Sequence, residues 1–461
     1  MNSTAVVAEG QRHRALGLST VAFTTCFAVW TIFSIIGVQI QKDLGLTDTE
    51  FGLLVGTPIL TGSLSRLALG IWTDQYGGRL VNTLVMLAAA AATFLLSYAE
   101  TYAEFLVAAL GVGIAGGSFA VGIAYVSRWY PVERQGTALG IFGMGNVGAA
   151  VTKFTAPFVM VALGWAAVAQ IWAAALAVMA VLFYLFAKDD PVLVERRLSG
   201  AKPKSAASQL EPLKKLQVWR FSLYYFFVFG AFVALALWLP RYLVGAYGLP
   251  ITLAGMLAAA YSIPGSIFRV LGGWLSDKIG ARTVMYWTFG VSAAVTFLLS
   301  YPTTTYIVQG IDGPIEFTLE MGVVPFTVLV FILGFFMSLG KAAVYKHIPV
   351  YYPENVGSVG GLVGLIGGLG GFVLPIAFGA LADLTGLWTS CFMLLFALVS
   401  TALVWMHFAI LRMERRAAPE LGELPQLPEM QGLRNVAKPV VERPPVQAAR
   451  PPQGRGFVPA E

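Results

Sequence analysis

Two copies of one pattern organise this chain: Arg66-Leu-Ala-Leu-Gly70-Ile-Trp-Thr-Asp74-Gln-Tyr-Gly77-Gly-Arg79 and, 203 residues later, Arg269-Val-Leu-Gly-Gly273-Trp-Leu-Ser-Asp277-Lys-Ile-Gly280-Ala-Arg282. Both read R-x-x-x-G-x-x-x-D-x-x-G-x-R. Each copy lies where a long apolar segment ends and a short polar loop begins. The first arginine of each copy is therefore inside an apolar segment and the last is outside it. This repeat predicts two similar halves, each with one buried cation.

The composition is that of a polytopic membrane protein. Of the 461 residues, 57% are hydrophobic and 12% are charged, and the mean hydropathy is +0.73. A soluble protein carries about twice that share of charged residues. The first apolar run is too long for the core of a signal peptide, so we expect it to remain as a transmembrane helix. Cys26 and Cys391 lie in separate apolar runs and predict no disulfide framework.

Twelve apolar runs are long enough to cross a membrane, because a hydrocarbon core of roughly 30 Å needs about 20 apolar residues in a helix. The predicted fold is an all-α integral membrane protein with twelve transmembrane helices in two pseudo-symmetric six-helix halves. Transporters of this plan hold their substrate between the halves, near the midplane. The runs lie at residues 18–41, 51–73, 80–98, 103–127, 137–162, 165–187, 218–243, 251–275, 283–301, 322–346, 357–380 and 387–411.

The polar stretches separate five parts and set the orientation. Of the 30 lysines and arginines, 24 fall on the side that holds both termini, and only Lys42 and Arg241 fall in loops on the other side. This asymmetry predicts cytoplasmic termini. The parts are a cytoplasmic N-terminal tail (1–17), an N-terminal bundle (18–187), a basic cytoplasmic linker (188–217), a C-terminal bundle (218–411) and a disordered, proline-rich cytoplasmic tail (412–461).

The two buried arginines predict an anion site. Arg66 lies eight residues before Asp74, which places it roughly 12 Å into the membrane at about 1.5 Å per residue. An arginine at that depth costs at least about 2.5 to 3.5 kcal/mol. All 24 acidic residues fall in loops, tails or helix ends, so no acid is available to pair with Arg66 or Arg269. The negative charge must come from a ligand, and a planar guanidinium suits a flat oxyanion or a carboxylate.

The remainder of each copy predicts a gate. Asp74 and Asp277 come at helix ends close to Arg79 and Arg282. Charge pairing of these four residues across the interface of the halves would hold one conformation of the protein. The loop resembles the signature of the major facilitator superfamily, and with twelve helices in two halves this resemblance covers the chain up to about residue 411.

Glycine-rich helices add a narrower resemblance. The chain contains Gly116-Gly117-Ser118-Phe119, Tyr130-Pro131, Gly143-x-Gly-Asn-x-Gly148 and Gly364-x-x-Gly-Gly-x-Gly-Gly371. Together these segments resemble the nitrate/nitrite porter (NarK/NasA) family of the superfamily. The resemblance implies that Arg66 and Arg269 are substrate ligands, that Asn146 is a pore-lining amide and that Phe119 is a ring against the substrate. It also implies a pore tyrosine, which we match to Tyr225, with Tyr224 as the alternative register.

Two lysines depart from the family pattern. Lys153 lies seven residues after Asn146, on the same helical face, and Lys341 lies near the inner end of the run 322–346. A desolvated lysine loses its proton more readily, so Lys153 is a candidate proton carrier or a third fixed charge for the anion. For Lys341 we keep two interpretations, a side chain that extends to the cytoplasm and a residue of the pore. As a residue of the pore, Lys341 is, like Lys153, a candidate for charge or proton coupling.

We expect a secondary transporter that moves nitrate and nitrite across the inner membrane by alternating access. Exchange of the two anions is slightly favoured, since it moves no net charge and needs no protonatable residue. The alternatives are proton-coupled nitrate symport, a carrier of another small anion, a nitrate sensor and, least favoured, an anion channel.

An enzyme is not expected, because His13, His347 and His407 have no metal-site spacing and no ATP-binding glycine loop is present. We predict no cofactor, metal or nucleic-acid partner, and a monomer in the lipid bilayer.

Overall fold

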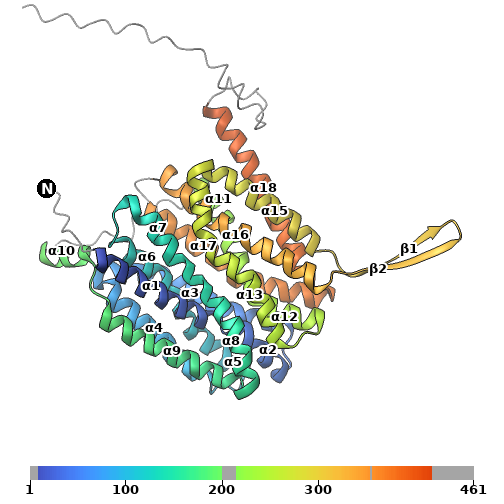
Figure 1. Ribbon diagram of the computed structural model, residues 1–461, viewed down its shortest axis with the longest axis horizontal. Coiled ribbons are helices and arrows are strands. Elements are labelled where there is room, and N and C mark those ends of the chain that lie inside the picture. Colours follow the sequence, from blue (N-terminus) through green and yellow to red (C-terminus); the bar gives the residue numbers. More distant parts are fainter. Residues whose placement is uncertain (1–8, 200–213, 353–355, 418–461) are drawn as a thin grey trace, which may run out of the picture. The chain divides into compact units, whose positions relative to one another are not determined.

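The structure of the protein is a computed structural model that describes residues 9–199, 214–352 and 356–417. It separates into two units, Met1–Met406 and His407–Glu461. The first unit holds two groups of helices, coloured blue to green and yellow to orange in Figure 1. The predicted N-terminal tail lies outside the described residues up to residue 8, as do residues 200–213 of the linker and the tail from residue 418 onward.

The N-terminal half contains the helices that precede the linker. They are α1 (Glu9–Trp30), α2 (Phe33–Leu44), α3 (Asp48–Tyr76), α4 (Gly78–Leu96), α5 (Tyr102–Gly113), α6 (Ser118–Ser127), α7 (Val132–Gly143), α8 (Gly148–Leu163) and α9 (Trp165–Phe186), with 3-10 turns η1 (Ile114–Gly117) and η2 (Met144–Val147). A short helix that we did not predict, α10 (Pro191–Ser199), begins the linker.

The C-terminal half follows the linker. Its elements are α11 (Leu216–Tyr225), the π-helical turn η5 (Phe226–Ala231), α12 (Phe232–Tyr247), α13 (Ile251–Ile267), α14 (Arg269–Leu275), the π-helical turn η6 (Ser276–Gly280), α15 (Ala281–Leu299), β1 (Thr304–Gly310), β2 (Gly313–Leu319), α16 (Val323–Tyr351), α17 (Val356–Thr385) and α18 (Ser390–Ala417).

Each predicted apolar run coincides with a helix or with consecutive helical segments. Ten stretches of the described residues are long and apolar enough to cross a membrane. One of them, Ile251–Leu299, contains two of the predicted runs, and α3 is not among the ten. Twelve membrane crossings therefore remain a prediction, although the helices themselves are present.

Local sequence explains where α3 begins and ends. Thr47 accepts a hydrogen bond from the backbone N–H of Glu50, and the Glu50 carboxylate accepts one from the N–H of Thr47. This reciprocal cap satisfies two N–H groups that a helix start leaves free. After α3 comes Gly77, with a φ of 90°, and the equivalent Gly280 of the second copy has a φ of 87°. Residues with a side chain rarely adopt a positive φ, which explains the glycine at this position in both copies.

The two halves pack against each other through pairs of helices. Helix α3 lies along α17, α8 lies along α13, and α2 lies along α12. The backbones of α3 and α17 approach so closely that there is no room for a side chain between them. A Cβ at Gly52 would lie 2.2 Å from the carbonyl oxygen of Pro375, and a Cβ at Gly379 would lie 2.0 Å from that of Asp48. The interface of the halves is therefore tight at the end where α3 begins.

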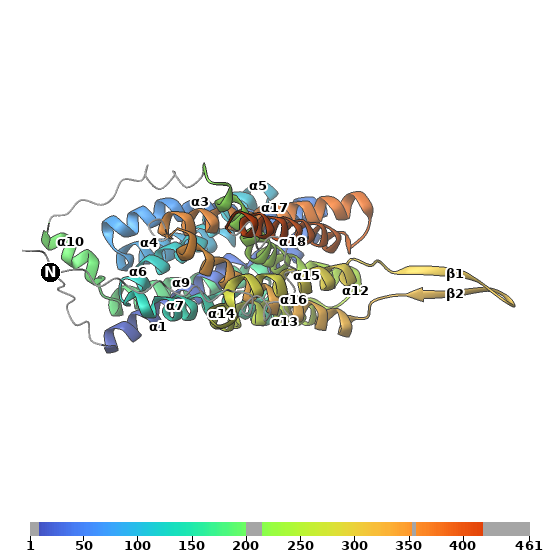
Figure 2. The ribbon, with the colours of Figure 1, turned by 90° about the horizontal axis from the view of Figure 1, so that it is seen from above.

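A β-hairpin departs from the all-helical prediction. Strands β1 and β2 pair antiparallel from Thr304 with Leu319 to Gly310 with Gly313. Figure 2 shows the hairpin extending away from the helices between α15 and α16. Its base lies at the end of the bundle where α12 ends, because the Tyr247 hydroxyl donates to the carbonyl oxygen of Met321 at 3.0 Å.

Candidate anion-binding site

Arg66 reaches from α3 into the interface of the halves. Its Nη1 donates to the carbonyl oxygen of Gly364 on α17 at 3.0 Å, and the side chain is buried. Aromatic rings surround its guanidinium carbon, with centroids at 5.2 Å for Phe119, 5.5 Å for Phe229 and 5.9 Å for Trp30. Rings attract a cation that has left water, so they reduce the cost of burying Arg66 without neutralising it.

Arg269 occupies the corresponding place in the C-terminal half. It lies 18 residues after the first residue of α13, and Arg66 lies 18 residues after the first residue of α3. The Arg269 guanidinium carbon lies 5.9 Å from the ring centroid of Phe119 and 5.9 Å from that of Tyr345. The two arginines therefore approach the same Phe119 ring from opposite halves.

Neither arginine has a carboxylate partner in the part of the chain that the structure describes. Hydrogen-bonding capacity is left over as well: within the same residues, Nε of Arg66, Nη1 of Arg269 and both amide atoms of Asn146 are buried without a partner. A buried donor without an acceptor costs about 1 to 3 kcal/mol. Such unused donors around two unpaired cations fit an anion that supplies both the charge and the acceptors.

Asn146 lies in the 3-10 turn η2, which packs against α1 and α13. One turn earlier, Gly143 faces the Arg269 guanidinium, and a Cβ there would lie 3.3 Å from its Nη1. The glycine leaves room for Arg269 next to the turn that carries Asn146. The structure therefore places these two predicted site residues on neighbouring segments.

Tyr225 lies in the same aromatic cluster. Its ring stacks on Phe229 at 5.1 Å and meets Tyr345 edge-on at 4.9 Å. Tyr224 points to a different environment, against Phe221 and Phe289. Of the two registers that the sequence left open, the one with Tyr225 brings the ring next to the residues that surround the arginines.

Several residues around the site were missed from the sequence. They are aromatic side chains and a backbone carbonyl, which carry no charge or motif to mark them. Tyr345 also donates from its hydroxyl to the carbonyl oxygen of Gly360 at 3.1 Å, which fixes its ring beside Arg269. The missed contacts come from Trp30, Phe229, Tyr345 and the carbonyl of Gly364.

Both lysines are buried. Lys153 on α8 donates to the hydroxyl of Ser262 on α13 at 2.7 Å, which joins the two halves. Lys341 on α16 donates to the carbonyl oxygen of Gly265 at 2.8 Å. The interpretation of Lys341 as a side chain that extends to the cytoplasm is wrong, because its side chain is fully buried and turned toward α13.

Comparison with known proteins identifies the group to which the chain is related. Residues 18–315, more than half of the chain, match the Major Facilitator Superfamily. The chain belongs to this superfamily. The predicted major facilitator fold is thereby confirmed, with the number of crossings still a prediction, and the protein is a multi-pass membrane protein.

Relatives within the superfamily confirm the narrower resemblance to the nitrate/nitrite porter family. A protein of Thermus thermophilus named "Probable nitrate/nitrite antiporter NarK1" is 45% identical over 426 residues, which cover 89% of this chain and 94% of the relative. The "Nitrite extrusion protein" of Bacillus subtilis is 31% identical, with 86% and 95% covered. The "Probable nitrate/nitrite transporter NarK2" of Mycobacterium tuberculosis is 33% identical, with 80% and 89% covered.

A solved structure supports the superfamily fold. It is a bacterial homologue of the human lysosomal transporter Spinster, described as inward-facing and occupied, with a TM-score of 0.64 and 16% sequence identity. The match covers 87% of this chain and 97% of that chain. At this identity the likeness shows the fold alone.

The superfamily loops hold the predicted gating residues. Arg79 donates from Nε and Nη2 to the carbonyl oxygen of Tyr184, at 3.0 and 2.8 Å, within the N-terminal half. Asp277 forms an ion pair with Lys346. Arg282 donates to the hydroxyl of Tyr351 at 2.9 Å. The side chain of Asp74 lies outside the described residues. These contacts of Arg79, Asp277 and Arg282 each remain within one half of the superfamily fold.

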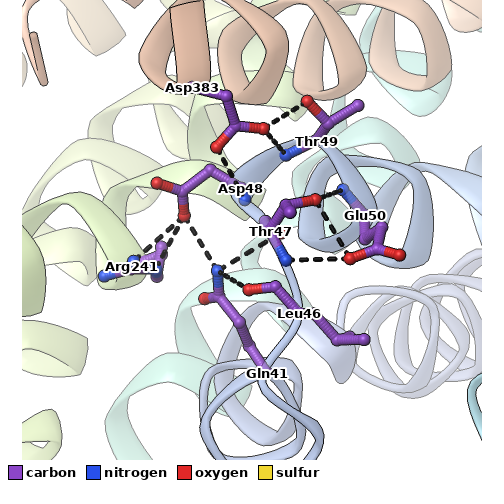
Figure 3. Close-up of polar contacts among 8 residues, drawn as sticks. All are labelled: Gln41, Leu46, Thr47, Asp48, Thr49, Glu50, Arg241 and Asp383. Carbon is purple, nitrogen blue, oxygen red and sulfur yellow. Dashed lines mark hydrogen bonds and ion pairs between the residues drawn. The ribbon is translucent and has the colours of Figure 1, made fainter. Parts of the chain in front are cut away.

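The opposite end of the bundle carries a polar network that joins the halves (Figure 3). The Asp383 carboxylate on α17 accepts hydrogen bonds from the N–H groups of Asp48 (3.1 Å) and Thr49 (2.8 Å) and from the Thr49 hydroxyl (2.5 Å). Arg241 on α12 forms an ion pair with Asp48 at 3.0 Å. We call Asp48, Thr49, Arg241 and Asp383 the Asp383 network. Sequence analysis placed Arg241 at this end but did not predict its partners.

Proposed function

We propose that this protein transports nitrate and nitrite across the inner (plasma) membrane by alternating access. The observation that supports this proposal is that Arg66 and Arg269 approach one ring, Phe119. Both arginines have unused N–H groups and no carboxylate partner among the described residues. The names of the relatives, which include nitrate/nitrite antiporter and nitrite extrusion protein, support these two anions as the substrates.

The chemistry of the proposed site favours a small planar anion. Two guanidinium forks donate pairs of hydrogen bonds to trigonal oxygens, and flat rings fit the faces of a weakly hydrated anion. In this assignment Arg66 and Arg269 bind the oxygens, Asn146 donates from its amide, and Phe119 and Tyr225 line the faces. A carrier of another small anion remains an alternative with the same arginines.

Exchange of nitrate for nitrite is the favoured mode. Without an anion, two like charges remain close in a poorly hydrated space, so the empty carrier should change conformation slowly. A bound anion of either kind removes this barrier. Proton-coupled nitrate symport is the second candidate, and the buried Lys153, whose ammonium contacts a neutral hydroxyl, is the observation that favours it.

Alternating access requires that each end of the bundle close in turn. With cytoplasmic termini, the Asp383 network lies on the outer side and holds that side closed in this conformation. We assign Asp74, Arg79, Asp277 and Arg282 to the inner gate, which would pair across the halves when the outer side opens. The bond between Lys153 and Ser262 also crosses the interface, so it too would break in that transition.

The test is an exchange assay in proteoliposomes that contain the purified protein. Vesicles loaded with nitrite should take up labelled nitrate without a membrane potential or a pH gradient, whereas vesicles without internal anion should not. Saturable uptake separates a carrier from a channel. Uptake that requires an inward proton gradient and ignores internal nitrite would establish symport and exclude exchange. Nitrate binding without any flux would indicate a sensor.

A further inference from the structure

Lys341 is a buried cation that the exchange mechanism does not use. Its ammonium group lies 3.0 Å from the ring centroid of Phe232 and donates to the carbonyl oxygen of Gly265. Among the described residues no carboxylate lies within ion-pair distance of it. A lysine in such a place either moves a proton or has a structural task, and its contacts distinguish the two.

The acceptor of Lys341 lies at a break in the helix that carries Arg269. Helix α13 ends at Ile267, and α14 begins at Arg269. Between them Phe268 has a ψ of 5°, away from the helical value. Carbonyl oxygens in the last turn of a helix accept no hydrogen bond from a helical N–H group. The ammonium of Lys341 donates to one of these oxygens, that of Gly265.

Helix α16 contacts the chain on both sides of this break. Before it, Lys341 binds Gly265; after it, Gly272 packs against Leu339, where a Cβ on the glycine would lie 2.6 Å from the Leu339 Cα. One turn beyond Lys341 on α16, Tyr345 places its ring beside the Arg269 guanidinium. One helix therefore holds the segment before Arg269, the segment after it and the side chain itself.

The Phe232 ring completes the arrangement. It lies under the ammonium of Lys341 and also against Gly265, where a Cβ would lie 2.0 Å from the ring. The ring thus keeps the donor and the acceptor in place together. All of these residues belong to the C-terminal half, so the arrangement does not depend on which end of the interface is open.

We propose that Lys341 is a positioning residue: it fixes the break at Phe268 and thereby the direction in which Arg269 faces the anion. This inference rests on the proposed function of the same site. It assigns to Lys341 no proton transfer and no contact with the anion. Arg269 of a variant without this bond should keep its charge and lose its alignment.

The experiment measures nitrate–nitrite exchange in proteoliposomes for Lys341→Met, Lys341→Gln and the wild-type protein, with Lys42→Met as a control at an exposed lysine. For Lys341→Met we expect the KM for nitrate to rise about tenfold or more, because a misaligned Arg269 loses roughly one charged hydrogen bond to the anion. The maximal rate should change less. Lys341→Gln, which retains an N–H donor for Gly265, should recover part of the affinity. Lys42→Met should behave as the wild type.

The outcomes separate this inference from the proposed function. If Lys341→Met exchanges nitrate for nitrite with an unchanged KM but loses uptake driven by a proton gradient, Lys341 carries protons and the inference is wrong. Equal defects in Lys341→Gln and Lys341→Met would also contradict it. Should Lys341→Met not fold, the Gln variant and Phe232→Leu, which removes the ring under the ammonium, provide the same comparison. A wild-type protein without exchange would instead refute the proposed function.

Discussion

Arg66 and Arg269 differ in how their charges are accommodated before any anion binds. Arg66 uses the carbonyl of Gly364 and three rings, whereas Arg269 has two rings; each keeps one buried nitrogen without a partner, Nε of Arg66 and Nη1 of Arg269. An anion at the proposed site could therefore accept from an unused N–H of either arginine, and it would find Arg66 already oriented by Gly364. Orientation in advance lowers the entropic cost of binding.

Replacing Arg66 by lysine tests the importance of the planar fork. Arg66→Lys keeps the charge but cannot donate to Gly364 and to the anion with the same geometry. We expect nitrate affinity to fall about tenfold to a hundredfold, because charged hydrogen bonds contribute about 1.5 to 3 kcal/mol. The measurement is the KM for nitrate in the exchange assay. Full affinity in this variant would remove Arg66 from the ligands of the anion.

Charge patterns made some site residues predictable and left others hidden. Arg66 and Arg269 are recognisable because a cation in an apolar run without an acid is rare. Trp30, Phe229 and Tyr345 are not, since the chain has 31 phenylalanines, 17 tyrosines and 11 tryptophans and most of them only pack. Tyr225 was proposed through a family resemblance, and its place in the aromatic cluster depends on contacts that the sequence does not contain.

At the scale of the elements, the site coincides with interruptions of regular helices. Phe119 follows the 3-10 turn η1, Asn146 lies in η2, Tyr225 precedes the π-helical turn η5, and Arg269 follows the break at Phe268. Such interruptions redirect side chains, and they are frequent at functional sites. A pattern of apolar residues predicts the helices but not these single-turn changes, because each run remains apolar throughout.

Helix α17 provides a matched pair of glycines for testing this arrangement. At Gly367 a Cβ would lie 2.3 Å from the Tyr225 ring, whereas at Gly361 it would meet nothing within 4 Å. We expect Gly367→Ala to displace Tyr225 or α17 and to lower transport about tenfold, since overpacking costs about 1 to 3 kcal/mol. Gly361→Ala should transport normally. Comparing the two rates at equal amounts of folded protein checks the prediction, and equal rates would contradict it.

On the scale of the whole molecule, residues far apart in sequence join the two halves at one end of the bundle. Asp48 and Asp383 are 335 positions apart, and neither lies in a recognisable motif. The two-half architecture could be predicted from the 203-residue repeat and the apolar runs. The end at which these residues join the halves could not, because it depends on how the halves meet and not on the sequence of either half.

Loss of the Asp383 charge should shift the equilibrium between the two conformations. The carboxylate accepts from the first N–H groups of α3, where a negative charge is favoured. We expect Asp383→Asn to increase the population open at this end about fivefold, for a loss of about 1 kcal/mol. Distances between spin labels placed across the interface would report the shift.

The control for this measurement is Asp43→Asn, at an exposed acid of the same end. Asp43 contacts Gln39 of its own helix at 2.7 Å and does not take part in the Asp383 network. Its neutralisation should leave the label distances unchanged. A distance change of the same size in both variants would show that general surface charge, and not the Asp383 network, sets the equilibrium.

The hairpin between α15 and α16 has a practical consequence for work on this protein. Its tip residue, Ile311, is fully exposed, and both native cysteines, Cys26 and Cys391, are buried. A thiol introduced at the tip would therefore be the accessible one, and a short epitope inserted there would disturb no helix packing. The hairpin offers an attachment point for a dye, a tag or an antibody fragment on the face where α12 ends.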